Sequence, residues 1–371
     1  MNNHIKPKLK ETIPYFLLDQ EVQIGEEVGV AGFIDDPTGC VAKLVSLLDG
    51  NHSLQEIVTR VQADFAEISE EEIRGAIQAM DQEGYLEDAS LVPRQMDSYL
   101  THRYKANLNY LSLFTDIYMS KYELQEKINN AKISLLGVGG LGSQILYHLA
   151  ALGFHQIKIL DFDTLDLSNF NRQLLYSEED LGRLKVDMAK KRIAQFNPNV
   201  NLETTNRKIE SARDVYEHVH GADYVISVAD RPTLDIQDWV NEGVVAAGLP
   251  MVSGGVLNTR GRFFTMIPGQ TGCVQCHVQQ VMTEDEKQKA LERHMRSVDF
   301  QRNNAAISPN VAILAGILVN ELLKVVTGTE EPLSLARVME FNFLDFTTSE
   351  VSAWTKQETC PICGKQERAL I

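Results

Sequence analysis

Residues 133–163 read ISLLGVGGLGSQILYHLAALGFHQIKILDFD, and this stretch decides the fold. The apolar run Ile133–Leu136 predicts a buried parallel strand, residues 143–152 predict a helix, and Ile157–Leu160 predicts a second strand. The turn between the first strand and the helix has the pattern G-x-G-x-x-G, with glycines at Gly137, Gly139 and Gly142. The stretch therefore predicts a strand–turn–helix–strand unit of an α/β fold.

An acidic residue completes this pattern. Asp161 follows the last of these glycines by nineteen residues, at the end of the second strand. Glycines in such a turn let backbone N–H groups approach a phosphate at the positive end of a helix, and an acid at this distance suits ribose hydroxyls. The unit therefore predicts a nucleotide site, which the pattern alone leaves open to a nicotinamide cofactor or to ATP.

Composition narrows the class of protein. The chain has 371 residues, enough for two or three domains, with the 44% hydrophobic and 23% charged content of a globular protein. A net charge of −16 argues against a nucleic-acid or anionic-membrane partner. The first residues lack an apolar signal core, and the longest apolar segment, 311–326, is interrupted by Asn320, Glu321 and Lys324. We therefore expect a cytoplasmic protein in which this segment is a buried helix.

The first ninety residues form a unit of their own. Ser53 and Ser69 each precede a glutamate by three residues, which is the spacing of a capping box. The order of elements predicts a small winged-helix-like α+β module in residues 1–90. Its strands are predicted at 13–18, 21–24, 30–35 and 85–86, and its helices at 39–48, 54–66 and 70–83.

Two further segments follow this module. Residues 91–130 predict a mostly helical connector, and residues 131–371 predict an α/β domain with a mostly parallel sheet. Within that domain, residues 233–240 predict a helix, and residues 244–245 and 251–252 predict short strands.

The N-terminal module resembles the precursor-recognition element of enzymes that modify ribosomally made peptides. The resemblance rests on the order of elements and on the stretches LLDGNHSLQEIVTRV (residues 47–61) and MDQEGYLED (residues 80–88). It implies that a leader peptide binds as an added strand, by β-augmentation. The alternatives are a structural appendage and a DNA-binding winged helix, although residues 70–72 are acidic where a recognition helix would be basic.

A second resemblance covers the last two-thirds of the chain. After Asp161 come SNFNRQ at residues 168–173, a G-x-x-K turn at residues 182–185, Asp230 and two C-x-x-C pairs. This ordered set resembles the E1-like activating enzymes, whose bacterial members adenylate sulfur-carrier proteins. The resemblance implies a Rossmann-like adenylation domain that uses ATP and Mg2+.

Carboxylate activation explains why these residue types are needed. A carboxylate that attacks the α-phosphate of ATP needs no general base, so the protein has to position anions and neutralise phosphate charge. Asp161 suits the ribose, and the resemblance implies catalytic roles for Arg172 and Lys185 on phosphate and for Asp230 on Mg2+. The implied nucleotide-binding residues are Gly137, Gly139, Gly140, Gly142, Asp161, Asp163, Asn169, Arg172, Lys185 and Asp230.

One position departs from the family pattern. The family has R-Y-x-R-Q ahead of the nucleotide unit, and its second arginine reaches the phosphates bound by the partner subunit. This chain has RYKAN at residues 103–107, so Ala106 replaces that arginine. Arg103 and Lys105 are the cations that remain beside it.

Four of the five cysteines form two C-x-x-C pairs, Cys273 with Cys276 and Cys360 with Cys363. Two pairs predict a closed tetrahedral Zn2+ site with a structural role, and a redox-active C-x-x-C is the alternative. Folding has to bring the pairs together, because 83 residues separate them. Cys40 remains in the N-terminal module, so the chain has no candidate for the transfer cysteine of ubiquitin-type activators.

A leader-binding module joined to an adenylating domain resembles the peptide-antibiotic enzymes of this superfamily. The pantocin type, to which the N-terminal module is closer, implies adenylation of a glutamate side chain in the precursor and cyclisation with loss of water and CO2. The microcin type implies adenylation of a peptide C-terminus and an N–P bond. Sulfur-carrier adenylation and a non-catalytic leader-binding scaffold are further alternatives. The family also implies a homodimer. For the charged segment at residues 283–300 it implies a role in covering the substrate's carboxyl end, and a solvated helix is the equal alternative.

Overall fold

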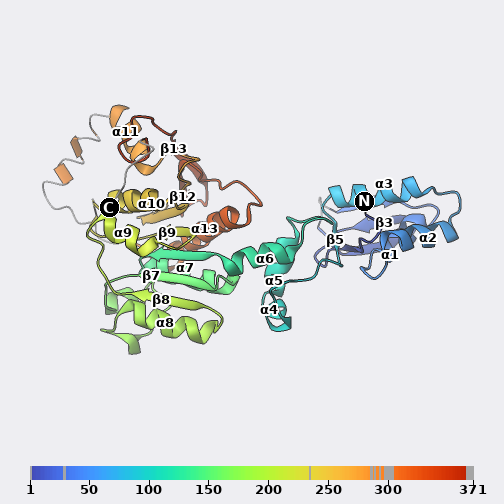
Figure 1. The fold of residues 1–371 in the computed structure, drawn as a ribbon, viewed down its shortest axis with the longest axis horizontal. Coiled ribbons are helices and arrows are strands. Elements are labelled where there is room, and N and C mark those ends of the chain that lie inside the picture. The colour runs from blue at the N-terminus through green and yellow to red at the C-terminus, as the bar shows by residue number, and fades with distance from the viewer. Residues whose placement is uncertain are drawn as a thin grey trace. The chain divides into compact units, whose positions relative to one another are not determined.

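The computed structural model describes residues 2–27, 31–233, 235–284 and 305–364, with a few positions between 287 and 295. The chain divides into two compact units, Met1–Lys127 and Ile128–Ile371 (Figure 1). The segment 283–300, interpreted either as a cover for the substrate's carboxyl end or as a solvated helix, lies mostly outside the described residues.

The N-terminal unit has three antiparallel strands followed by three helices, in the predicted order. The sheet has the strand order β2-β3-β4, and a separate pair joins β1 to β5. The strand predicted after the third helix is therefore present, but its partner β1 was not predicted. The elements are β1 (Pro7–Leu9), β2 (Tyr15–Leu18), β3 (Glu21–Ile24), β4 (Gly32–Asp35), α1 (Cys40–Leu47), α2 (Leu54–Asp64), α3 (Glu70–Gln82) and β5 (Leu86–Asp88).

Both predicted capping boxes are confirmed. The Ser53 hydroxyl accepts from the Glu56 amide, the Glu56 carboxylate accepts from the Ser53 amide, and Ser69 with Glu72 repeats the arrangement. These bonds satisfy amides that helix geometry leaves without intrahelical partners. The apolar faces of α2 and α3 then share one core with the inner face of the sheet, where Val22 is fully buried.

Three short helices follow, α4 (Ser98–Arg103), α5 (Lys105–Ser112) and α6 (Lys121–Asn130), so residues 91–130 are mostly helical as predicted. The buried ammonium of Lys10 donates to the carbonyl oxygen of Thr115 at 2.6 Å. This bond joins the chain after β1 to the loop before α6.

The second unit is built around an eight-stranded sheet with the order β13-β12-β11-β10-β9-β6-β7-β8. Neighbouring strands from β10 to β8 run parallel, whereas β11, β12 and β13 are added antiparallel. The predicted α/β fold is confirmed, with an antiparallel extension. The strands are β6 (Lys132–Leu136), β7 (Gln156–Leu160), β8 (Asn201–Thr205), β9 (Tyr224–Ser227), β10 (Met251–Leu257), β11 (Arg260–Met266), β12 (Arg337–Asn342) and β13 (Thr348–Ala353).

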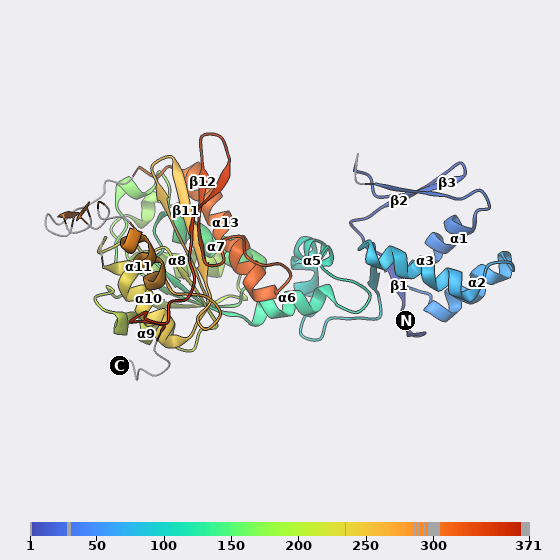
Figure 2. The same cartoon turned by 90° about the horizontal axis from the view of Figure 1, so that it is seen from above.

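Helices cover both faces of this sheet. Helix α7 packs against α8 and α13, and α9 packs against α10. Figure 2 shows β11 and β12 between α13 on one side and α9, α10 and α11 on the other. The chain reverses its direction of travel across the sheet between β6 and β9, which is the position where open α/β sheets bind ligands. The helices are α7 (Gly140–Leu152), α8 (Lys185–Phe196), α9 (Ala212–Val219), α10 (Ile236–Ala247), α11 (Val274–Glu284) and α13 (Ser308–Thr327).

One predicted strand is wrong. Residues 244–245 lie inside α10, which begins at Ile236 rather than at residue 233. Ile236, Val240 and Val244 recur at every fourth position and are all buried, so they form the inner face of a helix. The prediction of a strand rested on the two adjacent β-branched residues at 244–245, and the helical period of the buried residues was overlooked. The strand predicted at 251–252 is the start of β10.

By length and composition, one helix among the described residues, α13, is able to cross a membrane. In the structure 56% of its apolar window is buried within the unit, and it packs against α7, β10 and β11. Gly328, in the left-handed conformation, ends it. Helix α13 is therefore the core helix predicted from residues 311–326.

Gly142 supports a prediction about stability. A methyl group on its Cα would overlap the carbonyl oxygen of Gly137, so the turn cannot keep its shape with alanine. We expect Gly142→Ala to lower the free energy of unfolding of this unit by about 1–3 kcal/mol. Both tryptophans, Trp239 and Trp354, lie in this unit, so urea unfolding followed by tryptophan fluorescence reports on it alone.

Gly316→Ala is the matched control. Gly316 lies inside α13, and an added methyl group would meet no heavy atom within 4 Å. Alanine should therefore stabilise the helix by up to about 1 kcal/mol. Equal unfolding midpoints for Gly142→Ala and the unaltered protein would contradict the tight turn.

Candidate nucleotide site and metal centre

Two glycines shape the turn after β6. Gly137 has a φ of +92°, in the left-handed region, and a Cβ there would lie 3.2 Å from the backbone nitrogen of Ala229. Gly142 lies directly against the Gly137 carbonyl oxygen. Helix α7 begins at Gly140, and its N-cap residue, Gly139, provides no side-chain cap. The first amides of α7 therefore suit an outside acceptor such as a phosphate oxygen.

Asp161 fastens this turn to the end of β7. One of its carboxylate oxygens accepts from the Val138 amide at 2.8 Å, and the other accepts from the Asp163 amide at 2.8 Å. Burial raises the pKa of Asp161, while the charge of Lys185 and the two amides act against that rise. The residue predicted to bind ribose thus also holds the glycine turn, a role that the sequence pattern did not indicate.

Lys185 and Asp163 form a partly buried ion pair beside Asp161. The Lys185 ammonium donates to Asp163 Oδ2 at 2.7 Å, and the Lys185 amide donates to the Asp163 carbonyl oxygen at 3.0 Å. Lys185 is only 4% exposed and is the first residue of α8, which has no side-chain cap. An ammonium has three N–H donors, of which Asp163 takes one. Asp163 therefore fixes the position of the Lys185 ammonium at a second helix N-terminus.

Arg172 lies on the loop between β7 and α8, beside the glycine turn. A Cβ built on Gly140 would lie 3.4 Å from Arg172 Cδ, which is ordinary van der Waals contact. Arg172 Nη1 donates to Asn171 Oδ1 at 2.8 Å. Asn169 shapes the same loop, because its Oδ1 accepts from the Asp166 amide at 3.2 Å.

Asp230 lies exposed, three residues beyond β9. Burial lowers the pKa of Arg172, and the nearby Asp230 carboxylate opposes that change. The contact of Gly137 with Ala229 brings the end of β9 to the turn. The structure thus gathers at one edge of the sheet all of the predicted nucleotide residues, Gly137, Gly139, Gly140, Gly142, Asp161, Asp163, Asn169, Arg172, Lys185 and Asp230.

Sequence reasoning missed two residues that support the turn. The buried Tyr176 hydroxyl donates to the Val138 carbonyl oxygen at 2.9 Å, and burial raises the pKa of Tyr176 well above its usual value. Gln173 is only 2% exposed and lies beside the turn. Its Nε2 would be 3.8 Å from a Cβ atom built on Gly139. Gln173 belongs to the SNFNRQ motif, which could have indicated it, whereas nothing in the pattern marked Tyr176.

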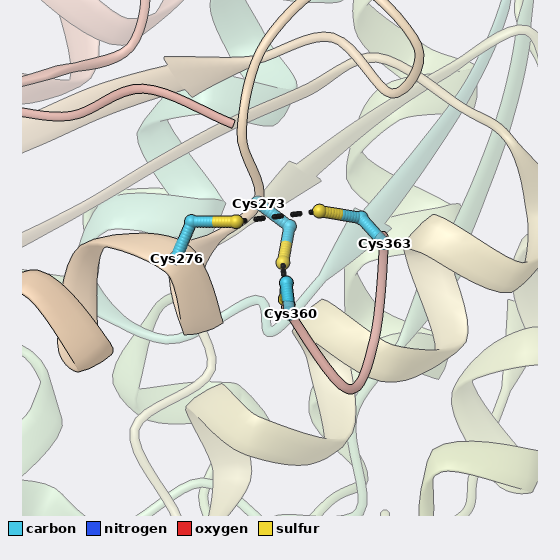
Figure 3. Close-up of side chains that lie close together, drawn as sticks. All are labelled: Cys273, Cys276, Cys360 and Cys363. Atoms are coloured by element: carbon cyan, nitrogen blue, oxygen red, sulfur yellow. Dashed lines mark hydrogen bonds between the residues drawn. The ribbon is translucent and has the colours of Figure 1, made fainter. Parts of the chain in front are cut away.

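The four paired cysteines meet elsewhere in this unit, at the start of α11 and in residues 360–363 (Figure 3). Their sulfur atoms all lie within 4.8 Å of one another. Cys273 Sγ lies 3.6 Å from Cys360 Sγ, and Cys276 Sγ lies 3.3 Å from Cys363 Sγ. A disulfide bond is much shorter, at about 2.05 Å. Four thiolates around Zn2+ have S–S separations of about 3.8 Å, so the arrangement fits a zinc ion.

Groups around the cysteines support the same interpretation. The Gln357 amide points at Cys276 Sγ from 3.4 Å, as expected for a donor to a thiolate. Burial raises the pKa of Cys276 to about 11, so the buried thiol is hard to deprotonate. A bound divalent cation offsets this because it favours the thiolate. His277 instead contacts Ser352 Oγ through Nε2 at 2.8 Å, so it is a neighbour of the cysteines and not a fifth ligand.

Comparison with known proteins agrees with this site. The model of the ThiF family matches residues 111–362, which include the glycine turn, the first cysteine pair and Cys360 of the second. The chain belongs to the ThiF family. Its place in the E1-like adenylating superfamily, suggested by the ordered motifs, is thereby confirmed.

Curated relatives of this ThiF-family chain include two adenylyltransferases. The sulfur carrier protein ThiS adenylyltransferase of Bacillus subtilis is 29% identical over 247 residues, which is 66% of this chain and 68% of the relative. The adenylyltransferase and sulfurtransferase UBA4 of Lodderomyces elongisporus is 28% identical over 245 residues, which is 65% of this chain and 50% of the relative. The match to UBA4 thus spans half the length of that protein.

Solved structures share the fold over nearly the whole chain. Escherichia coli MccB has a TM-score of 0.78 at 20% identity, and the match covers 98% of this chain and 99% of MccB. PaaA has a TM-score of 0.71 at 23% identity, covering 94% of this chain and 100% of PaaA. At this coverage the likenesses extend to the N-terminal unit.

The cysteine cluster supports a prediction about metal content. A closed site of four thiolates is expected to bind about one zinc ion per chain. Removing one thiolate opens the site, so the Cys360→Ser protein should bind far less zinc. The same variant should unfold at lower urea concentration, because the metal links two segments distant in sequence. Atomic absorption of the purified protein measures the first effect, and tryptophan fluorescence measures the second.

Cys40→Ser is the control for this experiment. Cys40 lies partly buried in the N-terminal unit and is not one of the four clustered cysteines, so its replacement should leave the zinc content unchanged. Full zinc occupancy in the Cys360→Ser protein would rule out the four-thiolate site.

Proposed function

We propose that this ThiF-family chain is an ATP-dependent adenylyltransferase that activates a carboxylate of a ribosomally made precursor peptide. The proposal rests on one observation above all. The glycine turn, Asp161, the Asp163–Lys185 pair, Arg172 and Asp230 lie together where the chain reverses across the parallel strands. This arrangement offers amide donors, two fixed cations and an exposed acid to one triphosphate.

The reaction follows from these groups. The peptide carboxylate attacks the α-phosphorus of ATP, the bond from that phosphorus to the bridging oxygen breaks, and pyrophosphate leaves. A carboxylate is already a nucleophile, so the protein contributes position and charge rather than a base. The amides of α7 and the side chains of Arg172 and Lys185 would stabilise the charge that develops on the phosphates. Asp163 holds Lys185 in place before the substrate binds.

Asp230 is the proposed ligand of Mg2+. In nucleotide sites Mg2+ keeps several waters and is held by one or two carboxylates together with phosphate oxygens. A single exposed carboxylate beyond β9 fits that requirement. Bound there, the ion would neutralise the departing pyrophosphate.

The cysteines support direct use of the acyl-adenylate. Four of them form the proposed structural zinc site, and Cys40 lies in the N-terminal unit. Burial raises the pKa of the Cys40 thiol, with nearby Asp36, Glu67 and Glu72 adding to the rise, so it is a weak nucleophile. A transfer thioester has no residue to form on, which argues against ubiquitin-like conjugation.

Residues 1–90 are proposed to bind the leader of the precursor peptide. The three-stranded sheet and three helices support this role, as does the likeness to MccB, which was crystallised with MccA. The pantocin-type resemblance of this module leads us to propose a glutamate side chain as the activated group, followed by cyclisation with loss of water and CO2.

We further propose a homodimer that works in the cytoplasm. In such a dimer Arg103 or Lys105 would take the place of the arginine that Ala106 replaces. Light scattering after size-exclusion chromatography tests the oligomeric state. Separate Arg103→Ala and Lys105→Ala variants then test which cation is used, through the KM for ATP.

Mass spectrometry separates the possible products. The protein is incubated with ATP, Mg2+ and a synthetic precursor peptide, and pyrophosphate is measured alongside peptide mass. Loss of water and CO2 supports glutamate activation and cyclisation. A gain of the mass of AMP supports the microcin-type reaction instead. Absence of pyrophosphate would overturn both.

Asp230→Asn tests the site directly. Loss of the carboxylate charge should reduce pyrophosphate release by about 100-fold or more, whereas binding of the precursor to the N-terminal unit should persist. Asp187→Asn is the control, because Asp187 is an exposed acid on α8 outside the gathered residues. Unchanged turnover in the Asp230→Asn protein would remove Asp230 from the mechanism.

A further inference from the structure

The side chain of Arg172 is held from one side. Its Nη1 donates to the Ser168 carbonyl oxygen at 3.0 Å and to Asn171 Oδ1 at 2.8 Å. A guanidinium carries N–H groups on Nη1, Nη2 and Nε, and Nη1 has two of them. Within the described residues these are the two hydrogen bonds of the guanidinium, so the edge formed by Nε and Nη2 remains for a ligand. Such an edge matches the paired oxygens of a phosphate.

This edge of Arg172 lies beside the start of α7. A Cβ atom built on Gly140, the first residue of α7, would lie 3.5 Å from Arg172 Nε. Gln144, about one turn further along α7, donates through Nε2 to the Arg172 carbonyl oxygen at 3.3 Å, so the helix also holds the backbone of the loop. The open N–H groups of Arg172 and the first amides of α7, which no side chain caps, are therefore placed for the same anion.

The partners of Asn171 determine how its side-chain amide is turned. Arginine has no acceptor, so the atom that faces Arg172 Nη1 has to be the Asn171 oxygen. In that orientation Nδ2 lies 3.5 Å from the Ala306 carbonyl oxygen, just ahead of α13. Asn171 is exposed, so its contact with Arg172 is not a consequence of core packing. The side chain therefore bridges the guanidinium and the chain that enters α13.

Asp230 is a competing partner for Arg172. The charge of its carboxylate acts on the guanidinium. An ionised acceptor binds a guanidinium more strongly than a neutral oxygen does. If Arg172 turned freely, pairing with Asp230 would occupy the donors needed for phosphate and the carboxylate proposed to hold Mg2+. The Asn171 amide and the Ser168 carbonyl are neutral, so they hold Nη1 without neutralising the charge of the guanidinium.

We infer that Asn171 is a positioning residue of the nucleotide site, which holds Nη1 of Arg172 so that Nε and Nη2 face a phosphate of ATP. The inference rests on the proposed function and deepens it, because the family motif assigns roles to Asn169 and Arg172 but none to Asn171. Asn171 acts through the guanidinium rather than on the reacting atoms. Its effect should therefore disappear when the Arg172 side chain is absent.

Isothermal titration calorimetry with ATP and Mg2+, in the absence of a peptide, measures this effect without turnover. Asn171→Ala removes one of the two acceptors of Nη1, so the guanidinium has to be ordered when ATP binds. The affinity for ATP should decrease about three- to tenfold, as expected for immobilising one long side chain. Asn320→Ala is the matched control, because the exposed Asn320 on α13 donates to the Gly316 carbonyl oxygen of its own helix. The control should bind ATP as the unaltered protein does.

A double-mutant cycle identifies the partner of Asn171. Arg172→Ala alone should lower the affinity for ATP about 10- to 100-fold, the expected loss for hydrogen bonds to a charged group. Adding Asn171→Ala to that variant should change the affinity by less than about twofold, because residues in contact are not additive. Losses that add in full would show that Asn171 acts independently of Arg172, and would overturn the inference.

Urea unfolding separates positioning from a structural role. Asn171 is exposed, so Asn171→Ala should leave the midpoint measured by tryptophan fluorescence unchanged. A lower midpoint together with an equal loss of ATP affinity in both backgrounds would assign Asn171 to the stability of the loop instead.

The outcomes separate this inference from the proposed function. Equal ATP affinity of the Asn171→Ala and unaltered proteins would overturn the positioning role, while pyrophosphate release with the precursor would still support adenylation. Conversely, coupled losses of ATP affinity in a protein that releases no pyrophosphate would keep the positioning role and remove the proposed activity. Absence of ATP binding to the unaltered protein would overturn both.

Discussion

The nucleotide edge of this protein depends on the two hydrogen bonds of the Asp161 carboxylate. One ties the turn after β6 to β7, and the other fixes the backbone at Asp163, whose side chain holds Lys185. A half-buried carboxylate is costly unless its oxygens are bonded, and here backbone amides supply both bonds. Because those amides belong to Val138 and Asp163, the cost is offset only when the turn after β6 and the loop after β7 are both correctly placed. Binding geometry and folding are thus coupled through one side chain.

The cysteine cluster would perform a comparable task for the antiparallel half of the sheet if it holds a metal ion. One cysteine pair follows β11 and the other follows β13, so a shared ion would join the two segments that leave the antiparallel strands. Trp354 reinforces the join, because its indole N–H donates to the Gly272 carbonyl oxygen at 2.9 Å and its ring lies 5.1 Å from that of His277. Gly272 itself allows the approach, since a Cβ there would lie 2.8 Å from the Thr355 carbonyl oxygen. A metal ion bound there would therefore stabilise the sheet that carries the nucleotide edge without contributing to the chemistry.

Local rules explain which features the sequence could predict. The β6–turn–α7–β7 unit and the capping boxes depend on neighbours within a few residues, so periodicity and spacing were sufficient. The pairing of β1 with β5 depends on residues about eighty positions apart, and no local pattern indicates it. Val244 and Val245, predicted as a strand, show that local patterns also fail where tertiary packing decides. Helix α10, which contains them, packs against α9, and this packing outweighs their β-propensity. At the site, residue types were predictable from the motif, but the second role of Asp161 and the bond from Tyr176 to Val138 arise only from tertiary structure.

The distribution of charge reconciles an acidic chain with an anionic substrate. A net charge of −16 would repel ATP if it acted uniformly, yet acidic side chains farther than about 10 Å from the site are largely screened at physiological ionic strength. What the triphosphate meets is local. Arg172, Lys185 and the uncapped starts of α7 and α8 lie there with three carboxylates, of which Asp161 is bonded to backbone amides, Asp163 is paired with Lys185, and Asp230 is the proposed ligand of Mg2+. Lys185 is nearly inaccessible to water, so its charge is screened much less than that of an exposed lysine. With eleven lysines and arginines against 22 acidic residues, the N-terminal unit carries −11 of the total charge of −16, so most of the negative charge lies outside the unit that contains the gathered nucleotide residues.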